Sequence, residues 1–173
     1  MNKISTPLEG EYASYAIDYI KLVPEGADVL ECMEDNMMDT EELILSVPKN
    51  KLEYRYAEGK WTIKEIIQHL IDCERIFCYR ALCIARRDET PLPGFDENLY
   101  AENSHANHRT IDSLLDELDN VRSCTIAMFR SFDRSVIENK GISNNNPLSV
   151  RAVAHIIVGH ELHHMNVIRE RYL

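Results

Sequence analysis

The chain has 173 residues, of which 45% are hydrophobic, and its 29 acidic and 19 basic side chains leave a formal charge of −10. This length is typical of one domain and buries a core without disulfide or metal staples. Six Gly and six Pro are too few for a collagen-like or disordered chain. The acidic balance argues against non-specific binding of nucleic acid or anionic membranes, because both depend on Lys and Arg.

The cysteines and the N-terminal residues favour an intracellular protein with reduced thiols. Five cysteines cannot all pair within one chain, and no two of them form a Cys-x-x-Cys motif. Residues 1–11 lack the apolar segment of a signal peptide, and no apolar run approaches the ~18 residues of a membrane span. We therefore expect a cytoplasmic protein.

The spacing of apolar residues predicts helices along the whole chain. Residues 11–23 form a short amphipathic leading helix, and four longer helices are expected over residues 27–47, 62–87, 110–132 and 149–172. Thr62 followed by Glu65 matches a capping box, and Thr110 and Ser149 are suitable N-caps. Acidic residues cover the outer faces of the helices at 27–47 and 110–132, so we expect the net negative charge to lie on the surface of the bundle.

The connection over residues 88–109 is unusually long. A loop of ~20 structureless residues is uncommon in a compact domain, so we expect a short helical turn at Glu97–Asn103. No stretch alternates polar and apolar residues for long, and residues 143–147 are interpreted as a turn. We expect an all-α four-helix bundle with a short leading helix and a long connection between its second and third helices. It forms a single domain over residues 1–173, with its core from about residue 24.

Two histidines occupy the core-facing stripe of the last predicted helix. His160 and His164 stand where a bundle would place Leu or Ile. Residues four apart differ by only about 40° in direction and about 6 Å in rise, so both rings can bind one ion. His69 lies in a similarly apolar stripe of the second long helix. Three imidazoles from two helices leave coordination positions open for water or substrate, which is typical of a catalytic site.

The alternative is that these rings only pack in the core. One buried histidine is more often a satisfied core residue than a ligand, and only the three together favour a metal site. Imidazole ligands suit nickel, zinc and iron alike, so the spacing predicts a divalent metal without identifying it.

Residues 160–164 also match the His-Glu-x-x-His motif of metalloproteases. We discount protease activity because only nine residues follow His164, and because no strands are predicted to hold an extended substrate. Glu161 and Asp72 are weaker candidates, either as a general base or as a carboxylate that orients a ligand. For Asp72, an ion pair with a nearby arginine is an equally good interpretation.

The remaining histidines have less defined roles. His163 is turned about 60° away from His160 on the helix, so it can replace a ligand or support one. His155 points to the far side of the same helix. His105 and His108 fall in the long connection, where they are either solvated or ligands on a lid.

Several segments of this chain resemble the DinB/YfiT-like family. Gly59–Asp72 resembles the start of the family's second helix, and Phe95–Asn98 resembles the connection that follows it. Gly159–His164 and Arg169–Tyr172 resemble its last helix. The resemblance extends from about Val23 to the end of the chain.

The resemblance implies a four-helix bundle, usually a homodimer, that holds one divalent metal. The implied ligands are His69, His160 and His164, and the sequence matches the family at all three positions. The family's name implies no binding of DNA, in agreement with the negative charge of this chain.

The leading functional hypothesis is a metal-dependent enzyme, in particular a thiol-dependent S-transferase that uses a low-molecular-weight thiol, as relatives in the family do. One alternative is a metal-dependent hydrolase that uses metal-bound hydroxide. Another is a non-enzymatic, metal-stabilised stress or interaction protein. A thiol requirement would separate the two enzymes, both of which act on a small-molecule substrate. Failure to turn over any substrate would indicate the third.

Overall fold

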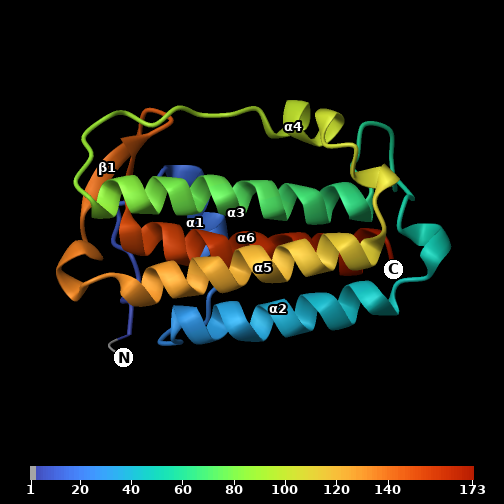
Figure 1. The fold of residues 1–173 in the computed structure, drawn as a ribbon, viewed down its shortest axis with the longest axis horizontal. Helices are drawn as coiled ribbons and strands as arrows, with labels where there is room; N and C mark the ends of the chain where they lie inside the picture. Colours follow the sequence, from blue (N-terminus) through green and yellow to red (C-terminus); the bar gives the residue numbers. More distant parts are fainter. Residues whose placement is uncertain (1–2) are drawn as a thin grey trace.

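The structure is a computed structural model that describes residues 3–173, and it is a bundle of four long helices. These are α2 (Val29–Ser46), α3 (Ile63–Ala85), α5 (Ile111–Ser131) and α6 (Val150–Arg171). Helices α2 and α3 each pack on both α5 and α6, and α6 lies behind α3 and α5 in Figure 1. The predicted four-helix bundle is confirmed. Met1 and Asn2, which belong to the predicted domain, lie outside the described residues.

The ends of the long helices agree with the predicted ranges to within two residues. The Thr62 hydroxyl accepts a hydrogen bond from the Glu65 N–H at 3.1 Å, and the Glu65 carboxylate accepts from the Thr62 N–H at 2.7 Å. This is the predicted capping box at the start of α3. The hydroxyls of Thr110 and Ser149 cap α5 and α6 in the predicted way. Local hydrogen bonds therefore set where these helices begin.

The leading segment is less helical than predicted. Within residues 11–23 only a 3₁₀ turn (Ser14–Ala16) and the one-turn helix α1 (Ile17–Ile20) form. Such a short helix is not stable alone, and it is held by packing against α6. Gly159 of α6 permits this contact, because a Cβ atom there would lie 2.0 Å from the Tyr19 carbonyl oxygen.

The connection between α3 and α5 contains the predicted helical turn, α4 (Glu97–Asn103). The Asp96 carboxylate caps it by accepting hydrogen bonds from two backbone N–H groups. A second short turn, Ala106–His108, follows. Both turns contact α3, and the connection runs along the outer side of this helix (Figure 1). It therefore covers α3 and does not extend into solvent.

A small hairpin corrects the prediction that the chain has no strands. Strands β1 (Lys140–Ser143) and β2 (Asn146–Ser149) are antiparallel, and Lys140 pairs with Ser149. The turn residues Asn144 and Asn145 have φ angles of 48° and 61°, which suits a two-residue hairpin because Asn tolerates the left-handed region. The turn was correctly placed, but strands of four residues are too short to show alternation.

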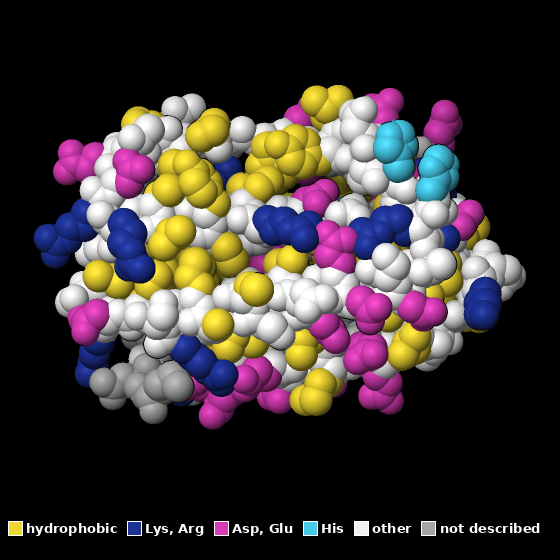
Figure 2. Space-filling view, in the orientation of Figure 1, with side chains coloured by type: hydrophobic (Ala, Val, Ile, Leu, Met, Phe, Trp, Pro, Cys, Tyr) yellow, Lys and Arg dark blue, Asp and Glu magenta, His cyan; other side chains and the backbone are white. Residues whose placement is uncertain are grey.

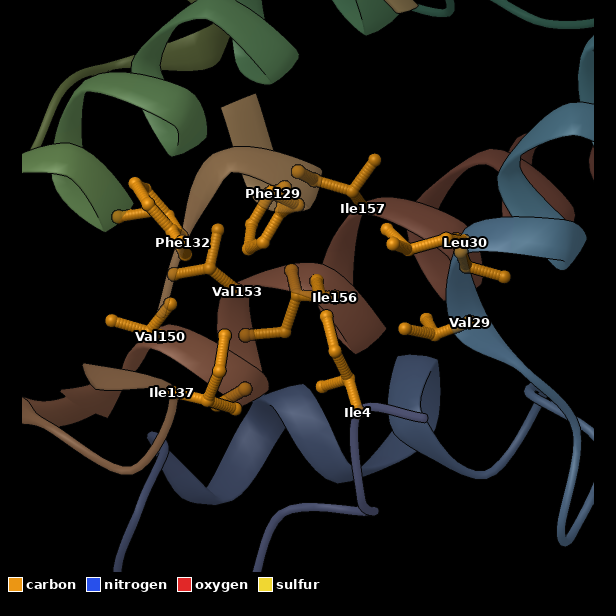
Figure 3. Packing of buried hydrophobic residues seen from close by; sticks show 14 of the residues in the cluster. Ile4, Val29, Leu30, Phe129, Phe132, Ile137, Val150, Val153, Ile156 and Ile157 are labelled. Atoms are coloured by element: carbon orange, nitrogen blue, oxygen red, sulfur yellow. The ribbon is translucent and has the colours of Figure 1, made fainter. Parts of the chain in front are cut away.

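The apolar core is divided into two clusters along the bundle. One cluster lies toward the hairpin and contains α6 residues as far as Val158, and the other contains α6 residues from Met165 onward. In the first, Phe129 of α5 and Phe132, the residue that follows this helix, lie around Val153 of α6 (Figure 3). Between the clusters, α6 carries residues 159–164, which include the histidines and Glu161. The middle of the bundle is therefore a polar layer.

Charged groups in this layer join all four long helices. Arg122 of α5 is only 1% exposed. Its guanidinium donates two hydrogen bonds of 2.9 Å to Glu74 of α3. It also donates to Glu161 of α6 and to the Met33 carbonyl of α2, both at 2.8 Å. Thr40 of α2 donates to the second oxygen of Glu161 at 2.9 Å.

The charges of this network depend on one another. Burial lowers the pKa of Arg122, but the two carboxylates outweigh it and raise the pKa above its ordinary value. The guanidinium therefore stays charged. Without it, Glu74 and Glu161 would be buried carboxylates with no cation to balance them.

The surface carries the negative charge, as predicted. Along α2 the exposed residues include Glu31, Asp35, Asp39, Glu41 and Glu42. Figure 2 shows acidic side chains gathered over α2 along the lower edge of the molecule. Within residues 3–173, no helix has the length and apolar character needed to span a membrane.

The network predicts a large loss of stability in Arg122→Met. Removing the guanidinium should lower the free energy of unfolding by about 3–5 kcal/mol, because two buried carboxylates lose their partner. The control is Arg130→Met, which breaks the half-exposed ion pair between Arg130 and Glu34 and should cost less than about 1 kcal/mol. Urea unfolding of both variants measures the difference. Equal losses would contradict the assigned importance of the buried network.

Candidate metal centre

Three histidines from two helices meet in the polar layer. The Nε2 atom of His69 on α3 lies 3.0 Å from Nε2 of His160 on α6. The Nε2 atom of His164, one turn further along α6, lies 3.1 Å from the same His160 nitrogen. One ligand atom from each residue lies within 4.8 Å of the others. The structure thus brings together the three residues that the sequence predicted as ligands.

The geometry of this cluster fits a divalent cation. Nitrogen ligands at about 2.0–2.1 Å from a tetrahedral metal are separated from each other by about 3.3 Å. The two short nitrogen separations, 3.0 and 3.1 Å, need only a small outward movement to reach that value. Rings that point Nε2 at one another cannot all satisfy these nitrogens by mutual hydrogen bonds, because each neutral ring carries one N–H. A shared cation would satisfy all three.

Burial keeps the three rings neutral. It lowers the pKa of His69 to about 4. It also lowers the pKa values of His160 and His164 well below the ordinary range, and the neighbouring histidines add to this effect. At neutral pH the imidazoles therefore offer lone pairs without first losing a proton, as metal binding requires.

Aromatic side chains hold the rings in place. The Trp61 ring lies 4.6 Å from the His69 ring, centre to centre. Tyr19 and Phe77 present their edges to His160 at 5.4 and 5.9 Å. These contacts leave the imidazoles little freedom to turn, so the cluster is organised before any ligand arrives.

Cys73, one of the cysteines predicted only as reduced thiols, lies beside the cluster. Its Sγ atom lies 3.5 Å from Nδ1 of His69. The thiol is buried, and burial raises its pKa to about 12, so it stays protonated. The signal was present in the sequence, since Cys73 follows His69 by four residues and so falls on the same face of α3.

A cavity of about 480 Å³ adjoins the histidine cluster, within the usual range for small-molecule sites. Its walls come from α3, α6, the leading segment, the covering connection and the hairpin turn. They include the three histidines, His163, Trp61, Cys73 and Phe77, and also Tyr15, Tyr19, Arg80, Gly94, Phe95, Glu97 and Asn144. Apart from His69 and the histidines of α6, these residues were not predicted as site residues, because their proximity depends on how the other segments fold over α3.

The two candidate carboxylates point elsewhere. Both oxygens of Glu161 are engaged by Thr40 and Arg122 in the buried network. Asp72 accepts a hydrogen bond of 3.0 Å from Gln68, and burial raises its pKa. It lies beside α4, and among the described residues neither carboxylate lines the cavity. These contacts indicate structural roles for both carboxylates. Asp72 bonds to Gln68, whereas the alternative considered for it was an ion pair with an arginine.

The other histidines are placed in three different environments. His163 is exposed, lines the cavity, and lies 5.1 Å from the His164 ring, centre to centre. His155 is buried on the far side of α6, with Nδ1 2.9 Å from the Arg151 carbonyl oxygen. His105 and His108 are exposed and stack on each other in the connection. Only His163 is thus placed near the cluster.

The lowered pKa of His69 predicts how stability changes with pH. Between pH 6.5 and about 4 the unfolded chain binds a proton at this position, whereas the folded chain does not. The metal-free protein should therefore lose stability as the pH falls through this window. The His69→Gln variant should lose less over the same interval, because it lacks this titrating group. Urea unfolding of both proteins across the window tests the effect, and identical slopes would contradict it.

Comparisons with known proteins identify the family of this chain. A family model described as the DinB superfamily matches residues 33–168. A protein of Oceanobacillus iheyensis named "Putative metal-dependent hydrolase OB0413" is 24% identical over 126 residues, which is 72% of either chain.

The fold is also found in a solved structure. YfiT from Bacillus subtilis, described as "a probable metal-dependent hydrolase with an unusual four-helix bundle topology", superposes with a TM-score of 0.72 and 18% identity. The match covers 96% of this chain and 90% of YfiT. Because the family model spans most of the bundle, including all three clustered histidines, the chain belongs to the DinB superfamily.

Proposed function

We propose that this protein is a metal-dependent hydrolase that acts on a small molecule. The observation that carries the proposal is the meeting of three buried, neutral imidazoles on the wall of a cavity of about 480 Å³. The names of the relatives in Oceanobacillus and Bacillus support the same activity. They favour the hydrolase alternative over the thiol transferase that the sequence analysis placed first.

In this proposal His69, His160 and His164 hold the metal. When bound, a divalent metal acts as a Lewis acid and lowers the pKa of a coordinated water toward neutrality. Three protein ligands leave a coordination position open, as in catalytic sites. Because all three histidines line the cavity, a metal held by them would be within reach of a molecule bound there. Trp61, Tyr19 and Phe77 hold the rings in the orientation that brings the Nε2 atoms together.

His163 is the best-placed group for proton transfer. It lines the cavity next to His164, whereas Glu161 is already bonded to Arg122 and Thr40. An imidazole is the side chain most often used as a general base or acid in hydrolysis. Tyr19 supports the His163 ring at 5.5 Å, centre to centre.

The remaining alternatives predict different behaviour. A thiol transferase needs a low-molecular-weight thiol as co-substrate, and this requirement stays a prediction. The homodimer that the resemblance implies also stays a prediction. A purely structural metal would be enclosed by four protein ligands. The cluster instead has three histidines beside a cavity, which favours an enzyme over a metal-stabilised interaction protein.

The predicted ligands can be tested by substitution. His160→Ala should lose the bound metal, measured by elemental analysis of purified protein, because its nitrogen is the one shared by both close pairs. His163→Ala should keep the metal but slow hydrolysis by about 10²–10⁴-fold, the typical contribution of general acid–base catalysis. His108→Ala, an exposed histidine outside the cavity, is the control and should change neither.

The reaction class is tested with a panel of esters, amides and phosphate esters. Each is assayed with the metal-loaded protein, with and without a low-molecular-weight thiol. We expect turnover without thiol. Turnover that occurs only with thiol would show a transferase, and unchanged metal content in His160→Ala would contradict the proposed site.

A further inference from the structure

We propose that the cavity binds a substrate that carries a carboxylate group, and that Arg80 of α3 recognises this group. The inference rests on the proposed function only in assigning the other end of the cavity to the metal. Arg80 is 8% exposed and lines the same cavity as the three histidines. Within residues 3–173, no Asp or Glu forms an ion pair with it.

This lack of an acidic partner distinguishes Arg80 from the other buried arginines. Arg122 binds two carboxylates, and Arg151 binds the Glu11 carboxylate at 2.6 Å. A buried charge is costly unless it is paired. The guanidinium of Arg80 is therefore placed to pair with an anionic group on a bound ligand.

The covering connection holds the Arg80 guanidinium in a fixed place. Its Nη2 atom donates to the Pro93 carbonyl at 2.8 Å. Its guanidinium carbon lies 5.7 Å from the centre of the Phe95 ring, a cation–π contact. The described residues provide no further hydrogen-bond acceptor, so Nε and Nη1 remain available to an anion. The planar guanidinium can bind a carboxylate through two parallel hydrogen bonds.

The hairpin anchors this part of the connection. Leu92, next to Pro93, donates its N–H to the Ile142 carbonyl and accepts a hydrogen bond from the Asn144 N–H, both at 2.9 Å. Asn144 also packs against Gly94, where a Cβ atom would lie 2.4 Å from the Asn144 side-chain oxygen. The segment that positions Arg80 is thus attached to the rest of the fold, as a specificity site requires.

The helix geometry sets the shape of the ligand. Arg80 follows His69 by eleven residues, which places the two on nearly the same face of α3, about 20° apart, with a rise of about 16 Å. Side chains on a helix lean toward its N-terminus, so the guanidinium reaches back toward His69. Cys73 and Phe77 line the cavity between them. An elongated, partly apolar molecule fits, with its carboxylate at Arg80 and its reactive bond near the histidines.

Apart from the proposed metal, the charged side chains of the cavity favour a single negative charge on the group that binds Arg80. Among the residues that line it, Arg80 is the single Arg or Lys, whereas Glu97 contributes a negative charge. A phosphate monoester carries nearly two negative charges, more than one guanidinium balances. A carboxylate matches one guanidinium in both charge and shape.

The test compares two probes of similar shape, 4-phenylbutanoate with a terminal carboxylate and 4-phenylbutanamide with a neutral amide, by calorimetric titration of the metal-loaded protein. The wild-type protein should bind the acid at least tenfold more tightly than the amide. Arg80→Gln should abolish this preference while keeping the metal content. Arg80→Lys should keep only part of it, because lysine lacks the two-pronged geometry. Arg86→Gln is the control, since Arg86 is exposed and stacks on Phe132 outside the cavity.

Further measurements separate this inference from the metal site. A preference that survives in Arg80→Gln would mean that the carboxylate binds elsewhere, for example to the metal, and would overturn the inference. Equal affinities in the wild type, or no binding of the acid, would also overturn it. In His160→Ala the preference should persist even without metal, because Arg80 is unchanged. A failed metal site and a failed carboxylate site thus give different results.

Discussion

The buried charge of Arg122 constrains the rest of the bundle. Four helices must approach it at the same level, because its hydrogen bonds run to α2, α3 and α6. This fixes how α6 is placed along α3, since Glu161 and Glu74 bind one guanidinium. His160 precedes Glu161 in the chain, so its position is fixed with it, about 100° around the helix. The ion network and the histidine cluster are thus two sides of one polar layer.

The polar layer interrupts the apolar core, and the two apolar clusters on either side of it make this possible. They supply the hydrophobic stabilisation, while the polar layer must satisfy each charge and nitrogen that it buries. The network achieves this by ion pairing. The histidines add no buried charge because they remain neutral, and neutral imidazoles are also the form that binds a metal. Burying these imidazoles lowers the stability of the fold, but it also keeps them in the neutral form that binds a cation.

The walls of the proposed substrate cavity come partly from the bundle and partly from the segments outside it. Helices α3 and α6 provide the histidines, and the leading segment, the connection and the hairpin provide much of the remaining wall. The connection also holds Arg80 through Pro93 and Phe95. Changes in these outer segments can alter the substrate without moving the proposed ligands, which is why binding residues are often found on loops over a rigid scaffold.

The sequence by itself determined the four long helices, the caps of three of them, and the helix faces on which the histidines of α3 and α6 lie. Helical spacing relates His160 to His164, and the capping box at Thr62 marks the start of α3, because both depend on residues within one or two turns. The length of the leading helix, the hairpin, the direction of Glu161 and the isolation of Arg80 were decided only by the tertiary structure. Spacing states which way a side chain points from its own helix, but not which segment lies there. Only packing brought Arg122 to Glu161, the Tyr19 backbone to Gly159, and the connection to Arg80.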